Sequence, residues 1–200
     1  MTEILRIFIP VYFLLFFSVA FVYKSVQTAK KIGKSPVVLP KDDSAYGLIG
    51  IYFKTTLIGL FLYAIAYGLF PGWHQYFLPI PVLEKALLKY TGIALCVITF
   101  GWVVLAQNDM KKSWRIGIDS GEKTELVTRG LFGISRNPIF FGMLLALLGL
   151  FLMTPNAIAL VLLVAGYILI QIQVRLEEEY LYQQHGQAYL SYKARVRRFL

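Results

Sequence analysis

The chain has 200 residues, of which 58% are hydrophobic and only 16% are charged, and its mean hydropathy is +0.63. Soluble domains carry about 25% charged residues, so this composition excludes a disordered tail, a disulfide-stapled secreted module and most cytosolic enzymes. The single cysteine, Cys96, permits no internal disulfide and no multi-cysteine metal site. We therefore expect an integral membrane protein without a metal centre.

Five apolar stretches predict five membrane-spanning helices, because a bilayer core about 30 Å thick requires roughly 20 apolar residues in a helix. In chain order they cover residues 7–23, 46–70, 87–106, 139–153 and 157–174. The first has no small-residue cleavage site after it, so we expect a retained helix and not a signal peptide. The last two are separated only by residues 154–156 and therefore form an antiparallel hairpin.

The predicted fold is thus an all-α membrane bundle. We expect a single domain over residues 1–200, in which residues 1–106 hold three spans and residues 107–200 hold a loop, the hairpin and a cytoplasmic tail. The tail is expected to be helical, because apolar and aromatic residues recur in it at approximately helical spacing. These residues are Leu181, Tyr189, Tyr192, Val196 and Phe199.

The basic residues predict the orientation. Sixteen of the 20 Lys and Arg residues, Lys41 and Lys123 among them, fall in the loop after the first span, the loop after the third and the tail after the fifth. Such loops stay in the cytoplasm. We expect an N-terminus outside and a cytoplasmic C-terminus, in a plasma (inner) membrane. The net charge of +9 then favours contact with membrane lipids and not nucleic acid, because no basic stripe with stacking aromatics lies outside the spans.

The hairpin predicts a cluster of charges at its cytoplasmic mouth. Folding the chain about Pro155-Asn156 brings Arg136, at the start of the fourth span, to Arg175 and Glu177–Glu179, at the end of the fifth. Ionisable groups at membrane depth are costly, which makes these residues functional candidates. The alternative is that they are interfacial anchors or a solvated cluster.

Pro138 is suited to the first turn of the fourth helix, where its missing N–H costs nothing. Backbone donors and the positive end of the helix dipole then lie near Arg136 and Asn137, and they suit a carboxylate or a phosphate. Gly142 and Gly149 recur one heptad apart on the same helix. They allow either close helix packing or close approach of a ligand.

Three segments resemble, in order, one family of membrane enzymes. Residues 136–142, Arg-Asn-Pro-Ile-Phe-Phe-Gly, resemble the Arg-His-Pro-x-Tyr-x-Gly signature of the isoprenylcysteine carboxyl methyltransferase and phospholipid methyltransferase superfamily. Residues 113–117 and 126–132 look like its lead-in, W-x-x-G … L-V-T-x-G-x-Y. Residues 175–192 are similar to its closing E-E-x-x-L … G-x-x-Y-x-x-Y. The likeness covers residues 108–197, nearly half the chain.

The resemblance implies a methyltransferase that uses S-adenosylmethionine without a Rossmann fold, and no Gly-x-Gly-x-x-Gly run follows a strand here. Glu177 or Glu178 would bind the ammonium group of this cofactor. Arg136, Arg175 and Glu178 are the expected catalytic residues, with Arg175 facing the substrate. The residues expected to contact the cofactor are Thr124, Leu126, Val127, Gly130, Phe132, Arg136, Asn137, Pro138, Phe140, Gly142, Glu177 and Glu178.

The chain departs from the family pattern at four positions. The signature histidine is Asn137, which keeps hydrogen-bonding ability but does not titrate, and the signature tyrosine is Phe140. The lead-in tyrosine is Phe132, and Thr124 replaces a histidine often found before the Leu-Val pair. These changes bear on individual contacts and on the substrate more than on the cofactor.

The sequence is compatible with two kinds of methyl acceptor, a carboxylate and an amine. A carboxylate is ionised at neutral pH and needs only a cation such as Arg175 or Arg136, whereas an amine needs a glutamate of the 177–179 run to take its proton. We expect a lipophilic or prenylated small molecule or peptide that enters from the bilayer, foremost the carboxylate of an isoprenylcysteine-like substrate. A phospholipid amine is the alternative acceptor.

Two other classes of protein stay open as well. A sterol-type reductase has a similar C-terminal half but normally more spans. A non-catalytic membrane scaffold would bind no cofactor and would tolerate the changes Arg136→Ala and Glu178→Gln. No obligate protein partner is expected in any of these cases.

Overall fold

The computed structural model describes residues 2–38, 44–117 and 124–200, and within these ranges it contains helices and no strand. The all-α prediction is therefore confirmed. The main helices are α1 (Thr2–Phe17), α2 (Lys24–Ile32), α3 (Ala45–Leu69), α4 (Ala86–Met110), α5 (Pro138–Met153), α6 (Ala157–His185) and α7 (Gln187–Arg195). A π-helical turn, η1 (Ser18–Tyr23), joins α1 to α2, and short 3₁₀ turns are η2 (Pro71–Phe77), η3 (Pro81–Leu83), η4 (Lys111–Ser113) and η5 (Gly130–Gly133).

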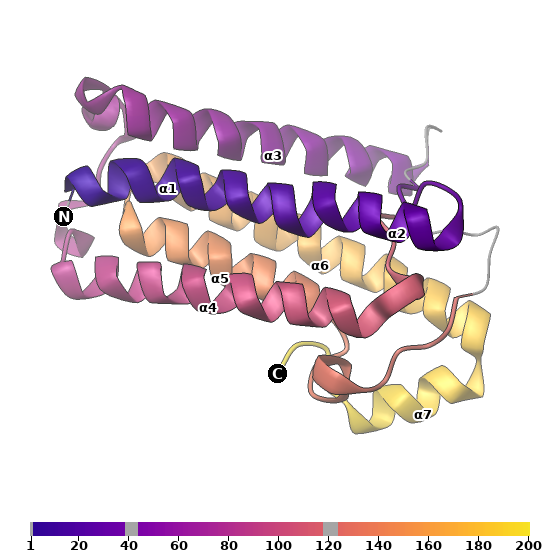
Figure 1. Cartoon of the computed structure of the whole chain (residues 1–200). Helices are drawn as coiled ribbons and strands as arrows, with labels where there is room; N and C mark the ends of the chain where they lie inside the picture. The colour runs from indigo at the N-terminus through magenta and orange to yellow at the C-terminus, as the bar shows by residue number, and fades with distance from the viewer. Residues whose placement is uncertain (1, 39–43, 118–123) are drawn as a thin grey trace.

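Five helices, α1, α3, α4, α5 and α6, run side by side in an elongated bundle (Figure 1). Among the described residues, four helical stretches are long and apolar enough to cross a membrane: Thr2–Ile32, Tyr46–Leu69, Ala86–Ser113 and Ala157–His185. The fifth, α5, is apolar but has only 16 residues, a length of about 24 Å. The chain is therefore a multi-pass membrane bundle with one short helix.

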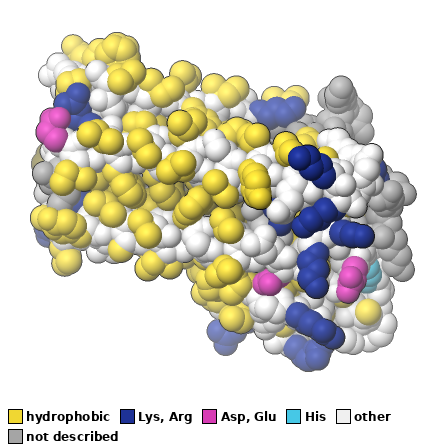
Figure 2. Space-filling model, viewed as in Figure 1, with side chains coloured by type: hydrophobic (Ala, Val, Ile, Leu, Met, Phe, Trp, Pro, Cys, Tyr) yellow, Lys and Arg dark blue, Asp and Glu magenta, His cyan; other side chains and the backbone are white. Residues whose placement is uncertain are grey.

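Charge is distributed unevenly along the bundle. Figure 2 shows Lys and Arg side chains gathered at the end where α2, the last turns of α6 and α7 lie, and hydrophobic side chains over the rest of that face. We call this end the basic end; the N-terminus lies at the opposite end (Figure 1). Lys41 and Lys123 lie outside the described residues. The number of crossings depends on whether the short helix α5 spans the bilayer, so the expected topology and the side of the membrane stay predictions.

Glycines bring α4 and α5 into close contact. A Cβ on Gly92 would lie 2.6 Å from the carbonyl oxygen of Gly149, and one on Gly149 would lie 2.7 Å from Sγ of Cys96. Toward the basic end, a Cβ on Gly142 would lie 2.5 Å from Cγ2 of Val103. Small residues at these positions let two helix backbones pack directly, which is how membrane helices associate without a hydrophobic driving force.

The short helix α5 leaves a recess at the basic end. The indole Nε1 of Trp102 donates a hydrogen bond to the carbonyl oxygen of Pro138 at 2.9 Å, which sets the start of α5 level with Trp102. Helix α4 continues to Met110, about 12 Å further along its axis. Helix α6 also extends past α5 (Figure 1). The first turn of α5 therefore forms the floor of a space between two longer helices.

The predicted hairpin is confirmed, and its turn is fixed by side chains. The Asn156 oxygen accepts a hydrogen bond from the Ala159 amide at 2.9 Å and so caps α6, while its Nδ2 donates to the Tyr63 hydroxyl at 2.7 Å. Thr154 donates its hydroxyl to the Leu150 carbonyl at 2.9 Å and closes the end of α5. These bonds set the register of the two helices and tie it to α3.

The C-terminal tail differs from the predicted continuous helix. Helix α6 runs on to His185, Gly186 adopts a positive φ of 51°, and α7 follows. Val196 and Phe199, which were expected on the helix, lie after its end at Arg195. The reason is a competing pairing, because the Arg136 amide donates to the Arg197 carbonyl at 2.9 Å and draws the chain end across the start of α5.

The glycine contacts predict that a single methyl group destabilises the bundle at one position and not at another. The change Gly92→Ala places a Cβ against the backbone of α5, and overpacking of this kind costs about 1–3 kcal/mol. Gly101→Ala is the matched control in the same helix, because nothing lies within 4 Å of its added Cβ. In detergent, the first variant should melt below the wild type and the second at or above it. Equal melting temperatures for both variants would show that α4 and α5 do not pack through their glycines.

Candidate active site

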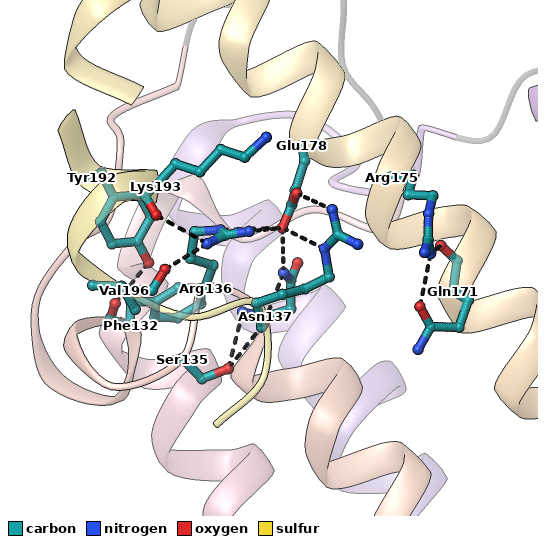
Figure 3. A network of polar contacts seen from close by, with 11 residues as sticks. Phe132, Ser135, Arg136, Asn137, Gln171, Arg175, Glu178, Tyr192, Lys193 and Val196 are labelled. Atoms are coloured by element: carbon teal, nitrogen blue, oxygen red, sulfur yellow. Dashed lines mark hydrogen bonds and ion pairs between the residues drawn. The ribbon is translucent and has the colours of Figure 1, made fainter. Parts of the chain in front are cut away.

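Glu178, on α6, is the centre of a buried ionic network at the basic end (Figure 3). Its side chain is only 6% exposed. Oε1 accepts hydrogen bonds from Arg136 Nη2 at 2.9 Å and Nε at 3.2 Å. Arg198 donates Nη2 to Oε2 at 2.8 Å and Nε to Oε1 at 3.2 Å. Two guanidinium groups therefore neutralise one carboxylate.

The same network fastens the chain end over α5. Asn137 donates its Nδ2 both to Glu178 Oε1 at 3.2 Å and to the Arg198 carbonyl at 3.1 Å. The Tyr192 hydroxyl donates to the Phe132 carbonyl at 2.7 Å. The two residues before α5, the chain end and α6 thus meet at the Glu178 side chain, while Tyr192 joins α7 to η5. The convergence expected from folding the hairpin about Pro155-Asn156 is present for Arg136 and Glu178.

The guanidinium of Arg136 uses most of its hydrogen-bond donors within this network. Besides its two bonds to Glu178, its Nη1 donates to the carbonyl oxygens of Val196 and Lys193. Its side chain is only 8% exposed. Arg136 therefore organises the site through contacts with the protein itself and has little donor capacity left for a ligand.

A cavity of about 130 Å³ lies in the recess above α5, and we call it the inner cavity. The first turn of α5 forms its floor, and η4, η5 and one face of α6 form its walls. Its lining residues are Met110, Ser113, Arg115, Gly117, Thr124, Phe132, Arg136, Asn137, Pro138, Ile139, Phe140, Glu177, Tyr180 and Leu181. Among the residues that the structure describes, Glu177 is the one acidic residue in this lining, and the one hydrogen bond that its carboxylate accepts there comes from Gln173 Nε2 at 2.8 Å.

A second cavity, of about 290 Å³, lies between α6 and α7, and we call it the outer cavity. It shares no lining residue with the inner cavity. The two cavities use different faces of α6, because residues three or four apart in a helix share a face and neighbours do not. The lining residues of the outer cavity are Arg175, Glu178, Glu179, Tyr182, Tyr189, Leu190, Lys193 and Arg198. The glutamate run is therefore split, with Glu177 on one side and Glu178 and Glu179 on the other.

The structure brings together seven of the residues expected to contact a cofactor. Those that line the inner cavity are Thr124, Phe132, Arg136, Asn137, Pro138, Phe140 and Glu177. Glu178 does not line it and instead forms the ionic network. Leu126 and Val127 are half-buried in the segment that leads to η5 and do not line the cavity either.

Two glycines that were expected to contact the cofactor, Gly130 and Gly142, are instead packed against other parts of the protein. Gly130 has a positive φ of 61°, and a Cβ there would collide with the carboxylate of Asp109, which accepts a hydrogen bond from the Leu131 amide at 2.9 Å. Gly142 faces α4, against Val103, so the structure favours the packing explanation for it over close approach of a ligand.

Arg175 makes no contact with Arg136 or Glu178 in the ionic network, although it lines the outer cavity together with Glu178. Its Nη1 donates to the carbonyl and the side-chain oxygen of Gln171, at 2.6 and 2.7 Å, and the side chain points away from Arg136 (Figure 3). It lines the outer cavity and not the inner one. A contact between Arg175 and a ligand in the inner cavity is not supported by this arrangement.

Sequence reasoning missed two residues that build the site. Asp109 holds η5 beside the end of α4, and Arg198 supplies the second cation for Glu178. The hydrogen bonds to Glu178 raise the pKa of Arg198 above its ordinary value, so the pair stays charged. Arg198 belongs to the basic tail that was used only to predict topology, and the exposed neighbours Arg195 and Arg197 gave no signal that would have singled it out.

The fold and the site together define a multi-pass membrane protein with a polar recess at one end of its helical hairpin. A family model described as phospholipid methyltransferase matches residues 88–188, just over half of the chain. The chain belongs to this family, so the resemblance found in its motifs is confirmed and the protein is a membrane methyltransferase. No curated protein matches the chain.

The network predicts different roles for two adjacent glutamates. Glu178→Gln leaves the buried Arg136 and the partly exposed Arg198 without their counter-charge, and leaving a buried charge unpaired in this way costs about 3 kcal/mol. Glu177→Gln removes no ion pair and should change stability far less. Thermal unfolding of the two purified variants in detergent compares them directly. A loss of stability as large for Glu177→Gln as for Glu178→Gln would contradict the assignment of the buried network to Glu178.

Proposed function

We propose that the protein transfers a methyl group from S-adenosylmethionine to a lipophilic acceptor, with the cofactor bound in the inner cavity. The sulfonium of this cofactor supplies the methyl group by in-line displacement, so the task of the protein is to position the two reactants. The observation that carries the proposal is a half-buried carboxylate, Glu177, in a recess formed by the family's signature segment. Enzymes of the matched family generally use this cofactor.

The residues of the inner cavity fit the amino-acid end of the cofactor by their chemistry, and a cavity of about 130 Å³ has room for that end of the molecule and not for all of it. The ammonium group of an amino acid needs an anionic acceptor, and Glu177 offers a carboxylate engaged by only one neutral amide. Its neighbour Glu178 is neutralised by Arg136 and Arg198, which removes it as a competing site. We therefore assign the ammonium contact to Glu177, where the sequence left Glu177 and Glu178 as equal candidates.

The route of each reactant follows from the position of the recess. The basic end is proposed to face the cytoplasm, where a water-soluble cofactor has direct access. The apolar side chains of Ile139, Phe140 and Leu181 line the same cavity. They provide a surface on which a lipophilic acceptor that enters from the bilayer can lie.

The two arginines that line the inner cavity, Arg115 and Arg136, already donate hydrogen bonds to the protein, and this favours an amine acceptor over a carboxylate. A carboxylate in the inner cavity would need a cation, yet Arg136 is bound to Glu178 and to two carbonyls, and Arg115 donates to the carbonyls of Lys112 and Trp114. A neutral amine needs no such partner. Of the two acceptors expected from the sequence, the phospholipid amine therefore fits the site better than the isoprenylcysteine-like carboxylate, and it agrees with the description of the matched family.

Cofactor binding tests the first part of the proposal. S-adenosylmethionine titrated into the detergent-purified protein should bind saturably, and Glu177→Gln should weaken binding about tenfold or more, because a charge-assisted hydrogen bond contributes about 1.5–3 kcal/mol. Glu3→Gln is the matched control, since Glu3 is an exposed carboxylate at the opposite end of the bundle. Absence of saturable binding in the wild type would refute the proposal, and unchanged affinity in Glu177→Gln would refute the assigned contact.

Acceptor preference and pH dependence test the second part. With labelled cofactor at saturation, phosphatidylethanolamine should be methylated and a farnesylcysteine analogue should not. An amine reacts in its neutral form, so its methylation rate should rise up to about tenfold per unit between pH 7 and 9, below an amine pKa of roughly 10. A carboxylate with a pKa of about 3.5 would give a flat profile over the same range. Free ethanolamine is the control, and its methylation at the rate of the lipid would exclude a lipophilic acceptor.

A further inference from the structure

The outer cavity contains cations that the protein itself does not neutralise. Within the part of the chain that the structure describes, neither Arg175 nor Lys193 forms an ion pair, and the bonds of Arg175 go to the neutral Gln171. Glu178 is neutralised by the network, which leaves Glu179, an exposed residue, as the remaining acidic lining residue. Two cations against one solvated carboxylate favour an anion in this cavity.

A buried hydroxyl in the cavity wall also lacks a hydrogen-bond acceptor. Tyr189, on α7, is 1% exposed, and its hydroxyl donates no hydrogen bond within the described chain. The side chain of Arg136 interacts with this hydroxyl, but a guanidinium has only donors and cannot accept its proton. Burial raises the pKa of Tyr189 to about 12, so the hydroxyl keeps its proton at neutral pH and is available as a donor. A buried polar group without a hydrogen bond is destabilising, and a ligand oxygen that accepts this proton would remove that cost.

We propose that the outer cavity binds a phosphate group, carried either by a phospholipid headgroup or by a soluble phosphate ester. Arg175 and Lys193 supply the charge, and Tyr189 supplies a neutral donor from α7. Donors that come from two helices match an anion with several oxygens better than a single carboxylate. The site is separate from the proposed cofactor site, because the two cavities have no lining residue in common.

The size and position of the cavity fit a headgroup-sized ligand. Its volume of about 290 Å³ lies at the lower end of small-molecule pockets, which range from roughly 300 to 1,000 Å³. Its lining residues belong to the last turns of α6, to α7 and to the chain end, and both helices reach the basic end in Figure 1. Arg198 and Glu178 line it as well, so a bound phosphate contacts the network that holds the chain end over α5.

Calorimetric titration of the full-length protein in a maltoside detergent, which carries no phosphate, tests this site. The two probes are glycerol 3-phosphate and dihexanoyl phosphatidylglycerol below its micellar concentration. At least one should bind with one-to-one stoichiometry. Lys193→Met and Arg175→Gln should each weaken binding about tenfold, and Tyr189→Phe should weaken it less, because it removes a neutral hydrogen bond. Lys31→Met, an exposed cation on α2 at the same end of the bundle, is the matched control and should leave binding unchanged.

The outcomes distinguish a phospholipid headgroup from a soluble phosphate ester, and they test the phosphate site separately from the cofactor site. Tighter binding of the lipid assigns the site to a headgroup, and equal binding of the two probes assigns it to a soluble phosphate ester. No saturable binding of either probe, or wild-type affinity in both Lys193→Met and Arg175→Gln, overturns the inference. Because the readout is phosphate binding alone, it does not depend on whether S-adenosylmethionine occupies the inner cavity.

Discussion

One buried carboxylate organises the basic end of the molecule. Glu178 is placed by α6, yet four of its five hydrogen bonds come from guanidinium groups that lie far from it in the sequence, on Arg136 and Arg198. A charge removed from water is tolerated only when it is paired and hydrogen-bonded, so the tail and the start of α5 must both reach this point. The position of the chain end and the separation of the two cavities both depend on this requirement.

The recess itself has a different origin, in helix length and backbone packing. Glycines let α5 lie directly against α4. The first residue of α5, Pro138, lies level with Trp102, so α4 extends beyond α5 toward the basic end. A polar pocket can then form between two longer helices without interrupting either of them. This arrangement places water-accessible chemistry beside an apolar bundle, which is the geometric requirement for a water-soluble cofactor to meet a lipid.

Much of this arrangement could be predicted from the sequence, because hydropathy and turn residues are local signals. The apolar stretches predict the spans, and the short turn at residues 154–156 predicts the hairpin. The meeting of Arg136 with Glu178 follows from counting residues outward from Pro155-Asn156. The face of a helix on which a residue lies, and the point at which a helix breaks, are not given by such local signals. Arg175 is close to Glu177 in sequence but lines a different cavity, and a turn break at Gly186 redirected the tail. Arg198 acts through a long-range pairing that no local pattern encodes.

We propose that Glu178 stabilises the fold at the basic end while its neighbour Glu177 binds the cofactor. A structure of the full-length protein with S-adenosylhomocysteine bound tests this claim most directly. We predict density in the inner cavity, with the ligand's ammonium within hydrogen-bonding distance of the Glu177 carboxylate and with Arg136 and Arg198 still bound to Glu178. Ligand density in the outer cavity, or a Glu178 side chain released from its arginines to bind the ammonium, would contradict it.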